Sequence, residues 1–211
     1  MDTVATVPFS STRAYLLEAR YEFLRLLRTP SFSLPCLLFP PVFYLLFGVL
    51  LGGKGGPVAA QYLLAGYGVF GVIGVALFGF GVTVALDREQ GLLTLKRAQP
   101  MPPGAYLVAK MAMALLFAAI ILLLLAALAA GVAHVRLSAA QWGAWAATCR
   151  MGVLPFSALG WWLGTWVGGR GAPALINLVY LPMAFLSGLW VPLTMLPELL
   201  QTLAPAWPAY H

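Results

Sequence analysis

The sequence predicts an all-α protein, a polytopic bundle of transmembrane helices, from two observations. Of 211 residues, 62% are hydrophobic and only 9% are charged, and the mean hydropathy is +0.90. Soluble domains usually carry about 25% charged residues, so this chain cannot cover a surface that faces water. The apolar residues also form uninterrupted runs as long as a membrane helix. Lipid is therefore the expected solvent, and a soluble enzyme is excluded.

A helix needs about 20 largely apolar residues to cross the hydrocarbon core. Windows free of Asp, Glu, Lys and Arg that reach this length predict about five spans. Pro40, Pro41 and Pro182 fall inside two of them, where we expect kinks, since neighbouring helices can satisfy the freed carbonyls. The window 137–149 is too short alone: it is either an interfacial helix or an extension of the fourth span, with Arg150 near a headgroup. The predicted spans are residues 31–52, 62–86, 109–132, 149–168 and 172–194.

The basic residues predict the orientation, because cytoplasmic loops of membrane proteins carry an excess of Lys and Arg. Nine of the twelve precede the first span, separate the second from the third, or separate the fourth from the fifth. The other three, Lys54, Arg136 and Arg150, lie on the opposite side. The N-terminus is therefore predicted to be cytoplasmic. Residues 195–211 are predicted to form a re-entrant or surface segment on the outer side.

Residues 10–28 predict an amphipathic helix in the cytoplasmic interface. Glu18, Glu22 and Arg25 share one face, opposite an apolar stripe. Basic residues on such a helix suit anionic headgroups; the alternative is an ordinary solvated helix packed on another subunit. The apolar stripe consists of Leu16, Ala19, Phe23, Leu26 and Leu27. The residues expected to characterise the interfacial helix are Arg20, Phe23, Arg25 and Arg28.

The loop 87–110, between the second and third spans, predicts a short helix over Leu92–Arg97. The prolines and the glycine that follow, from Pro100 to Gly104, end it. Exposed leucines in a loop that faces water favour contact with a partner protein. The alternative is a tether that only covers the ends of the neighbouring helices.

Glycines at 160, 164 and 168 recur every four residues along the fourth predicted span. Such spacing lets two membrane helices approach closely. The sequence leaves open whether Gly160, Gly164 and Gly168 pack against a helix of the same subunit or form the seam of a dimer.

Groups suited to catalysis or nucleotide binding are scarce. No ionisable residue falls in the middle of a span, Arg150 excepted, which counts against an ion-coupled carrier. His134 lies in an outer loop and His211 is the last residue, so neither forms a base–nucleophile pair. The glycine-rich run 52–56 lacks the spacing of a phosphate loop. We therefore expect no catalytic residue, metal or cofactor in this chain and no nucleic acid partner; any ATP must be bound by another polypeptide.

Four stretches, in order, resemble the membrane subunit of an ABC-2 type ABC transporter, the permease of a bacterial exporter. Where family members usually show Gly-Thr-Leu after an acidic residue, this chain has Glu89 and then Gly91 to Leu95. Members also have a sixth span after the outer segment, so we expect this sequence to be truncated before one. The four stretches are Tyr15–Arg28, Glu89–Gly91 with Leu95–Arg97 and Pro100, Pro155–Gly160, and Asn177–Pro182 with Ser187–Pro192 and Pro208–His211.

The resemblance implies a mechanism. Two permease subunits, identical or closely related, would pair in the bacterial inner (plasma) membrane, in contact with lipid, and dock two cytoplasmic ABC ATPase subunits. Those subunits would bind ATP and Mg, while this chain, not itself an enzyme, would move a drug, lipid or glycan outward. The resemblance places the coupling contact at Glu89, Gly91, Leu92, Leu93, Leu95, Lys96 and Arg97.

Two other functions remain possible from the sequence. A non-transport membrane scaffold or anchor would co-purify with partners but without an ATPase. An intramembrane enzyme would show activity in detergent without ATP.

Overall fold

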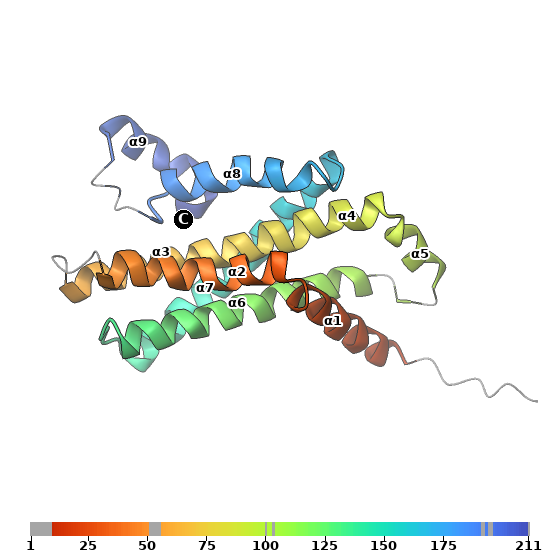
Figure 1. Ribbon diagram of the computed structural model, residues 1–211, viewed down its shortest axis with the longest axis horizontal. Coiled ribbons are helices and arrows are strands. Elements are labelled where there is room, and N and C mark those ends of the chain that lie inside the picture. Colours follow the sequence, from red (N-terminus) through yellow and green to blue (C-terminus); the bar gives the residue numbers. More distant parts are fainter. Residues whose placement is uncertain are drawn as a thin grey trace, which may run out of the picture.

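The computed structural model describes residues 10–50, 56–99, 101–102, 104–190, 193 and 196–210. This part of the chain is a helical bundle without strands, which confirms the predicted all-α membrane protein. Helices α2, α3, α6, α7 and α8 run along the long axis (Figure 1). Helices α1 and α5 lie at one end, called here the α5 end, and α9 lies at the other, the α9 end.

Three described helical stretches are long and apolar enough to cross a membrane. They differ in how far the rest of the chain covers them. Protein buries 72% of the best window of Val58–Glu89, against 28% for Pro30–Leu50 and 39% for Ala105–Gly131. Val58–Glu89 is therefore the central helix, and the other two present much of their surface to the surroundings. The central helix comprises α3 (Gly56–Ala76), the π-helical η2 (Leu77–Val82) and α4 (Thr83–Glu89).

The first and third stretches pack on this centre and on each other. Helix α2 (Pro30–Phe43) contains Pro40 and Pro41, and the chain continues as the π-helical η1 (Tyr44–Leu50). Helix α6 (Ala105–Gly131) contacts α2 and α3. Phe32 of α2 meets Phe117 of α6 edge-on, with ring centroids 5.7 Å apart.

Helix α7 (Ala139–Trp166) is continuous over 28 residues. It includes most of the window 137–149, which is therefore an extension of the fourth predicted span and not a separate helix. A capping box starts it: Ser138 Oγ accepts from the backbone N–H of Gln141, and the Gln141 side chain accepts from the backbone N–H of Ser138. This reciprocal pairing gives a hydrogen-bond acceptor to two backbone N–H groups that a helix N-terminus otherwise leaves without one.

Helix α8 (Ala172–Leu186) has 15 residues and ends well before residue 194, the predicted end of the fifth span. Gly188, at φ +76°, forms a Schellman turn in which the N–H of Leu189 donates to the carbonyl of Ala184. A helix of this length covers about 22 Å, less than the hydrocarbon core of about 30 Å. Helix α8 is therefore shorter than the predicted span 172–194, because this glycine turn stops the helix.

Short helices follow at the α9 end: α9 (Glu198–Leu203), η4 (Ala204–Ala206) and η5 (Pro208–Tyr210). Helix α9 and η5 pack against α8. Some residues named in the sequence predictions lie outside the described residues. They are residues 51–52 at the end of the first predicted span, residues 191–192 and 194 at the end of the fifth, and Lys54, Pro100, Met195 and His211.

A close contact between backbones joins α7 to the central helix at η2. A Cβ atom added to Gly164 would collide with the carbonyl of Gly81, and one added to Gly160 would lie 3.0 Å from the carbonyl oxygen of Ala76. Only glycine allows the two backbones to come this near. Gly160 and Gly164 therefore pack within one chain. Gly168 lies beyond the end of α7, beside Glu89.

Replacing Gly164 with Ala should destabilise the protein by about 1–3 kcal/mol, because the added methyl group overpacks this contact. Gly143 is the matched control: it lies in the same helix, and nothing lies within 4 Å of a Cβ built there. Gly143→Ala should leave stability unchanged or raise it by up to about 1 kcal/mol through helix propensity. Thermal unfolding in detergent, followed by tryptophan fluorescence, measures both. Equal midpoints for the two variants would contradict the close contact.

Candidate functional site at the α5 end

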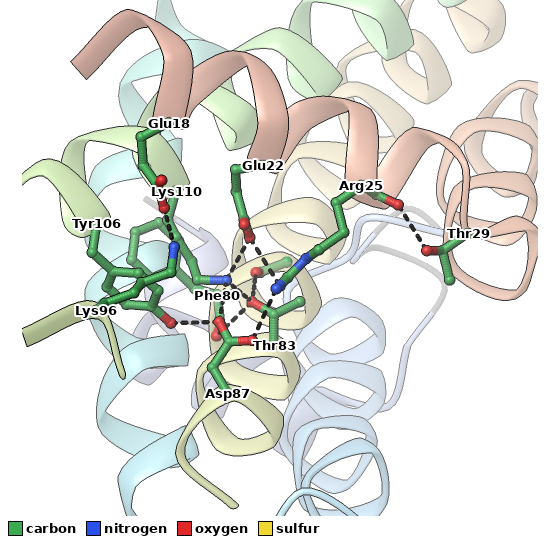
Figure 2. Close-up of polar contacts among 11 residues, drawn as sticks. Glu18, Glu22, Arg25, Thr29, Phe80, Thr83, Asp87, Lys96, Tyr106 and Lys110 are labelled. Atoms are coloured by element: carbon green, nitrogen blue, oxygen red, sulfur yellow. Dashed lines mark hydrogen bonds and ion pairs between the residues drawn. The ribbon is translucent and has the colours of Figure 1, made fainter. Parts of the chain in front are cut away.

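Four charged side chains meet between α1 (Ser11–Leu27), α4 and α6 (Figure 2). Lys110 of α6 is fully buried, and its Nζ donates to Glu22 Oε1 at 2.6 Å. The same Nζ lies 3.0 Å from Asp87 Oδ2 and donates to Thr83 Oγ1 at 2.6 Å. The lysine therefore connects one residue of α1 with two of α4.

Arg25 and Tyr106 complete this group, called here the Lys110 cluster. Arg25 donates to Asp87 Oδ1 at 3.0 Å and to Glu22 Oε1 at 3.1 Å. The Tyr106 hydroxyl donates to Asp87 Oδ2 at 2.8 Å. Burial by itself would lower the pKa of Arg25, but the carboxylates of Glu22 and Asp87 outweigh it, so the pKa lies above its ordinary value. The guanidinium is a permanent cation.

The cluster is electrically balanced, with two carboxylates and two cations. Transferring any one of these charges alone out of water is very unfavourable. Glu22, Asp87 and Lys110 have side-chain exposures of 4%, 3% and 0%, so none can be solvated from outside. Each is stable there only because the others are present. The cluster therefore holds α1, α4 and α6 in one mutual arrangement.

The predicted coupling loop folds as the short helix α5 (Leu92–Ala98). Gly91, at φ +72°, turns the chain between α4 and α5, a conformation that favours glycine. None of the α5 residues is buried, and Leu95 is 57% exposed. Leu92 and Leu93 are half-buried, whereas Arg97 is exposed. An apolar side chain is thus presented outward at the α5 end.

Helix α5 is tied to α1 through Lys96. The Lys96 ammonium donates to Glu18 of α1 in an ion pair, and it lies 5.0 Å from the centroid of the Tyr106 ring. Lys110 lies 5.1 Å from the centroid of that ring. Tyr106 is therefore near both lysines, and it links α5 to the Lys110 cluster (Figure 2).

The residues next to α5 in sequence hold a different part of the bundle. Arg88 donates to the carbonyls of Thr165 and Val167, at the C-terminal end of α7. The Glu89 carboxylate accepts from the N–H of Gly169, in the turn before α8. Glu89, predicted as part of the coupling contact, is exposed but is directed at this turn. The end of the central helix thus contacts α7, α8 and, through Gly91, α5.

The predicted faces of α1 need correction. Glu22, expected opposite the apolar stripe, is buried against the bundle, whereas Leu16 of the stripe is 67% exposed. Phe23 does face inward, with its ring centroid 5.2 Å from that of Phe117. The reason is electrostatic: buried Lys110 requires a carboxylate, and Glu22 supplies it. Arg20 and Arg28 are exposed. Whether they contact headgroups stays a prediction.

Sequence reasoning missed Thr83, Asp87, Tyr106 and Lys110 as members of a site. It treated Asp87 and Lys110 as the two ends of the loop 87–110. One signal was available: charged residues are few, and Asp87 and Lys110 are each one residue from the end of a predicted span, at 86 and at 109. Such positions favour pairing across helices. The pairing itself requires the tertiary structure.

A bundle of apolar helices with a paired polar cluster and an exposed short helix at one end defines a polytopic helical membrane protein. The ABC-2 type transporter family model matches residues 14–211. The chain belongs to the ABC-2 type transporter family. It is also similar to a Bacillus subtilis (strain 168) protein named "Putative transport permease YvfS", with 28% identity over 195 residues, which cover 90% of this chain and 78% of that protein. No solved structure shows a significant match.

Replacing Lys110 with Met should destabilise the protein by about 3–5 kcal/mol, because it leaves two buried carboxylates with one counter-charge. Arg97→Met at the same end removes an exposed charge and should change stability by less than about 0.5 kcal/mol. Combining Lys110→Met with Glu22→Gln should destabilise less than the sum of the two single variants, because the double variant is again balanced. Thermal unfolding of the four variants tests this. Additive losses would show that the cluster is not coupled.

Proposed function

We propose that this chain is the permease subunit of an ATP-binding cassette exporter in the bacterial inner membrane. It works as a pair of identical or closely related subunits and docks a cytoplasmic ATPase subunit that binds ATP and Mg. Family membership supports a transport role with an ATPase partner. The excess of basic residues at the α5 end supports its placement in the cytoplasm.

The observation that carries this proposal is α5 itself. A seven-residue helix with no buried residue and an outward leucine adds little to the packing of its own subunit. Its position between Gly91 and the proline-rich return to α6 presents it beyond the end of the bundle (Figure 1). Such an apolar projection suits a groove on a partner protein.

The contacts of α5 supply a path for movement. A push on α5 reaches α1 through Lys96 and Glu18, and it reaches α4 and α6 through Tyr106 and the Lys110 cluster. Because the charges of the Lys110 cluster are paired and buried, they move together more readily than they separate. Closure of the ATPases would thus reposition the transmembrane helices as a unit.

A cavity of about 420 Å³ between α2, α3 and α8 supports a substrate with an apolar part. Its lining contains no charged side chain, and its walls are largely aromatic. The volume falls within the usual range for small-molecule pockets, about 300–1,000 Å³. These features favour a drug or the lipid part of an amphiphile over a free glycan. The aromatic walls are Phe32, Phe39, Phe43, Phe70, Phe78, Tyr180 and Trp190.

Replacing Leu95 with Asp should abolish recovery of the ATPase subunit with the permease and uncouple ATP hydrolysis from transport. The substitution puts a charge into the proposed apolar contact, and the exposed site should leave the fold intact. The measurement is affinity purification of the tagged protein from its native membrane, with identification of the co-purified subunits. Leu203→Asp is the control, since Leu203 is 48% exposed on α9 at the other end.

A stoichiometric nucleotide-binding subunit with wild type and Leu203→Asp, but not with Leu95→Asp, would support the proposal. Clean recovery of wild type with other membrane proteins but no ATPase would favour the scaffold instead. Normal ATPase recovery and transport by Leu95→Asp would remove α5 from its proposed role.

Reversing one charge of the pair that joins α5 to α1 should impair transport, and reversing both should restore it. Glu18→Lys places two ammonium groups together, whereas Glu18→Lys with Lys96→Glu recreates the ion pair in the opposite sense. Because the pair is partly exposed, stability should change by only about 0–1 kcal/mol. Transport-coupled ATPase activity of the assembled complex is the readout. Failure of the double variant to recover any activity would argue against a path through this pair.

A further inference from the structure

Arg150 is the charged residue of α7 for which the structure provides no partner. It is exposed, and within the described chain its guanidinium makes no hydrogen bond or ion pair. It is the twelfth residue of α7, about 16 Å along the helix axis from Ala139. The sequence predicted that Arg150 lies near a headgroup, a level that the long side chains of arginines in membrane helices reach by extending along the helix surface.

Ionisable residues of membrane helices normally pair with a counter-charge or with backbone carbonyls. The described part of the chain provides no carboxylate near Arg150. The chain has six acidic residues; of the five that the structure describes, four are at the α5 end, and Glu198 begins α9, which packs on α8. A second copy of the chain would bring these same carboxylates to the same levels. The described carboxylates of one or two copies therefore do not supply the anion.

Arg150 borders a groove between α6 and α7 of about 320 Å³. Alanines of α6 form its floor, because their short side chains leave a channel between the helices. Trp142 and Trp145 form one wall, with ring centroids 5.7 Å apart. Every other lining residue is alanine or leucine, so the groove combines one cation with an apolar channel. The lining residues on α6 are Ala119, Leu122, Leu123, Ala126 and Ala130.

The direction of the side chain connects the two features. Cα–Cβ bonds of a helix lean toward its N-terminus, so Arg150 extends toward the α9 end, along Ala146 and Trp142 one and two turns away. Tryptophan is enriched where membrane helices approach the headgroup region. A guanidinium binds phosphate through paired, charge-assisted hydrogen bonds. An acyl chain has the length and the apolar character to fill the alanine channel.

We propose that the α6–α7 groove binds one anionic phospholipid from the leaflet at the α9 end, with the lipid phosphate on Arg150 and an acyl chain along the α6 alanines. The groove is separate from the aromatic cavity between α2, α3 and α8, with which it shares no lining residue. The bound lipid neutralises Arg150 and fixes the pairing of α6 with α7. This inference does not depend on the transport activity.

The test uses the full chain reconstituted in vesicles of equimolar phosphatidylglycerol and phosphatidylcholine. The protein is then extracted in mild detergent, and the retained lipid is quantified by native mass spectrometry. Wild type should keep about one phosphatidylglycerol per chain. Arg150→Gln should bind it about tenfold more weakly, through loss of the charge-assisted bonds. Ala126→Phe, which fills the channel but keeps the charge, should also lose it.

Two matched controls separate the groove from general surface effects. Arg136→Gln removes another exposed arginine on the same side of the membrane, and Ala127→Phe adds the same bulk to the neighbouring, outward residue of α6. Neither residue lines the groove, so both variants should retain lipid as wild type does. Undiminished retention by Arg150→Gln would overturn the proposal. So would equal losses in the groove variants and their controls.

Discussion

The structure depends on the neutralisation of one buried ammonium group. Lys110 lies at the end of a membrane helix with no exposure to water, and its charge is balanced by carboxylates from two other elements. That requirement turns Glu22 of α1 toward the bundle and holds Asp87 at the end of the central helix. Arg25 then compensates the second carboxylate. Because each charge is stable only with the others, α1, α4 and α6 cannot shift independently at this end.

Away from the cluster, a different force holds the bundle. In lipid, helices gain little from hiding apolar surface, because the solvent is equally apolar, so close packing and polar pairs must hold them together. The central helix packs closely because it has glycines on several faces. Gly81 lies against α7, and Gly71 lies against Pro40 of α2 and Ile121 of α6. Gly74 makes room for the hydroxyl of Tyr180 of α8, which donates to the carbonyl of Phe70.

The charge cluster and the glycine contacts hold different parts of the molecule, and these parts have different proposed functions. The middle of the bundle is joined by backbone contacts that tolerate little change in spacing, so it transmits displacement as a body. The α5 end is joined by side chains that span longer distances and that meet at Tyr106. A short exposed helix attached to this end suits a protein driven by a cytoplasmic partner. The exposed arginine on α7 borders the groove between α6 and α7, and the aromatic cavity lies elsewhere, between α2, α3 and α8.

The sequence by itself determined the class of the protein and most of its helices. Composition and run length sufficed for the membrane bundle, and the order of loose motifs sufficed for the ABC-2 family, because both depend on local residue types. Gly91 and the prolines after Ala98 likewise marked α5, since turn preferences are local. The end of α8 was missed. A single glycine among small and apolar residues does not reveal whether the chain continues as a helix or closes a Schellman turn.

Only the tertiary structure decided which charges are paired and which face of each helix is inside. Glu22 lies on what reads as the polar face of α1, yet it is buried, because its partner Lys110 is 88 residues away. The spacing of Gly160 and Gly164 predicted close packing, but only the structure shows that they pack against the backbone of the central helix. The window 137–149 was ambiguous until α7 proved continuous. Hydropathy averages over neighbours in sequence, whereas the free energy of a charge in a membrane depends on neighbours in space.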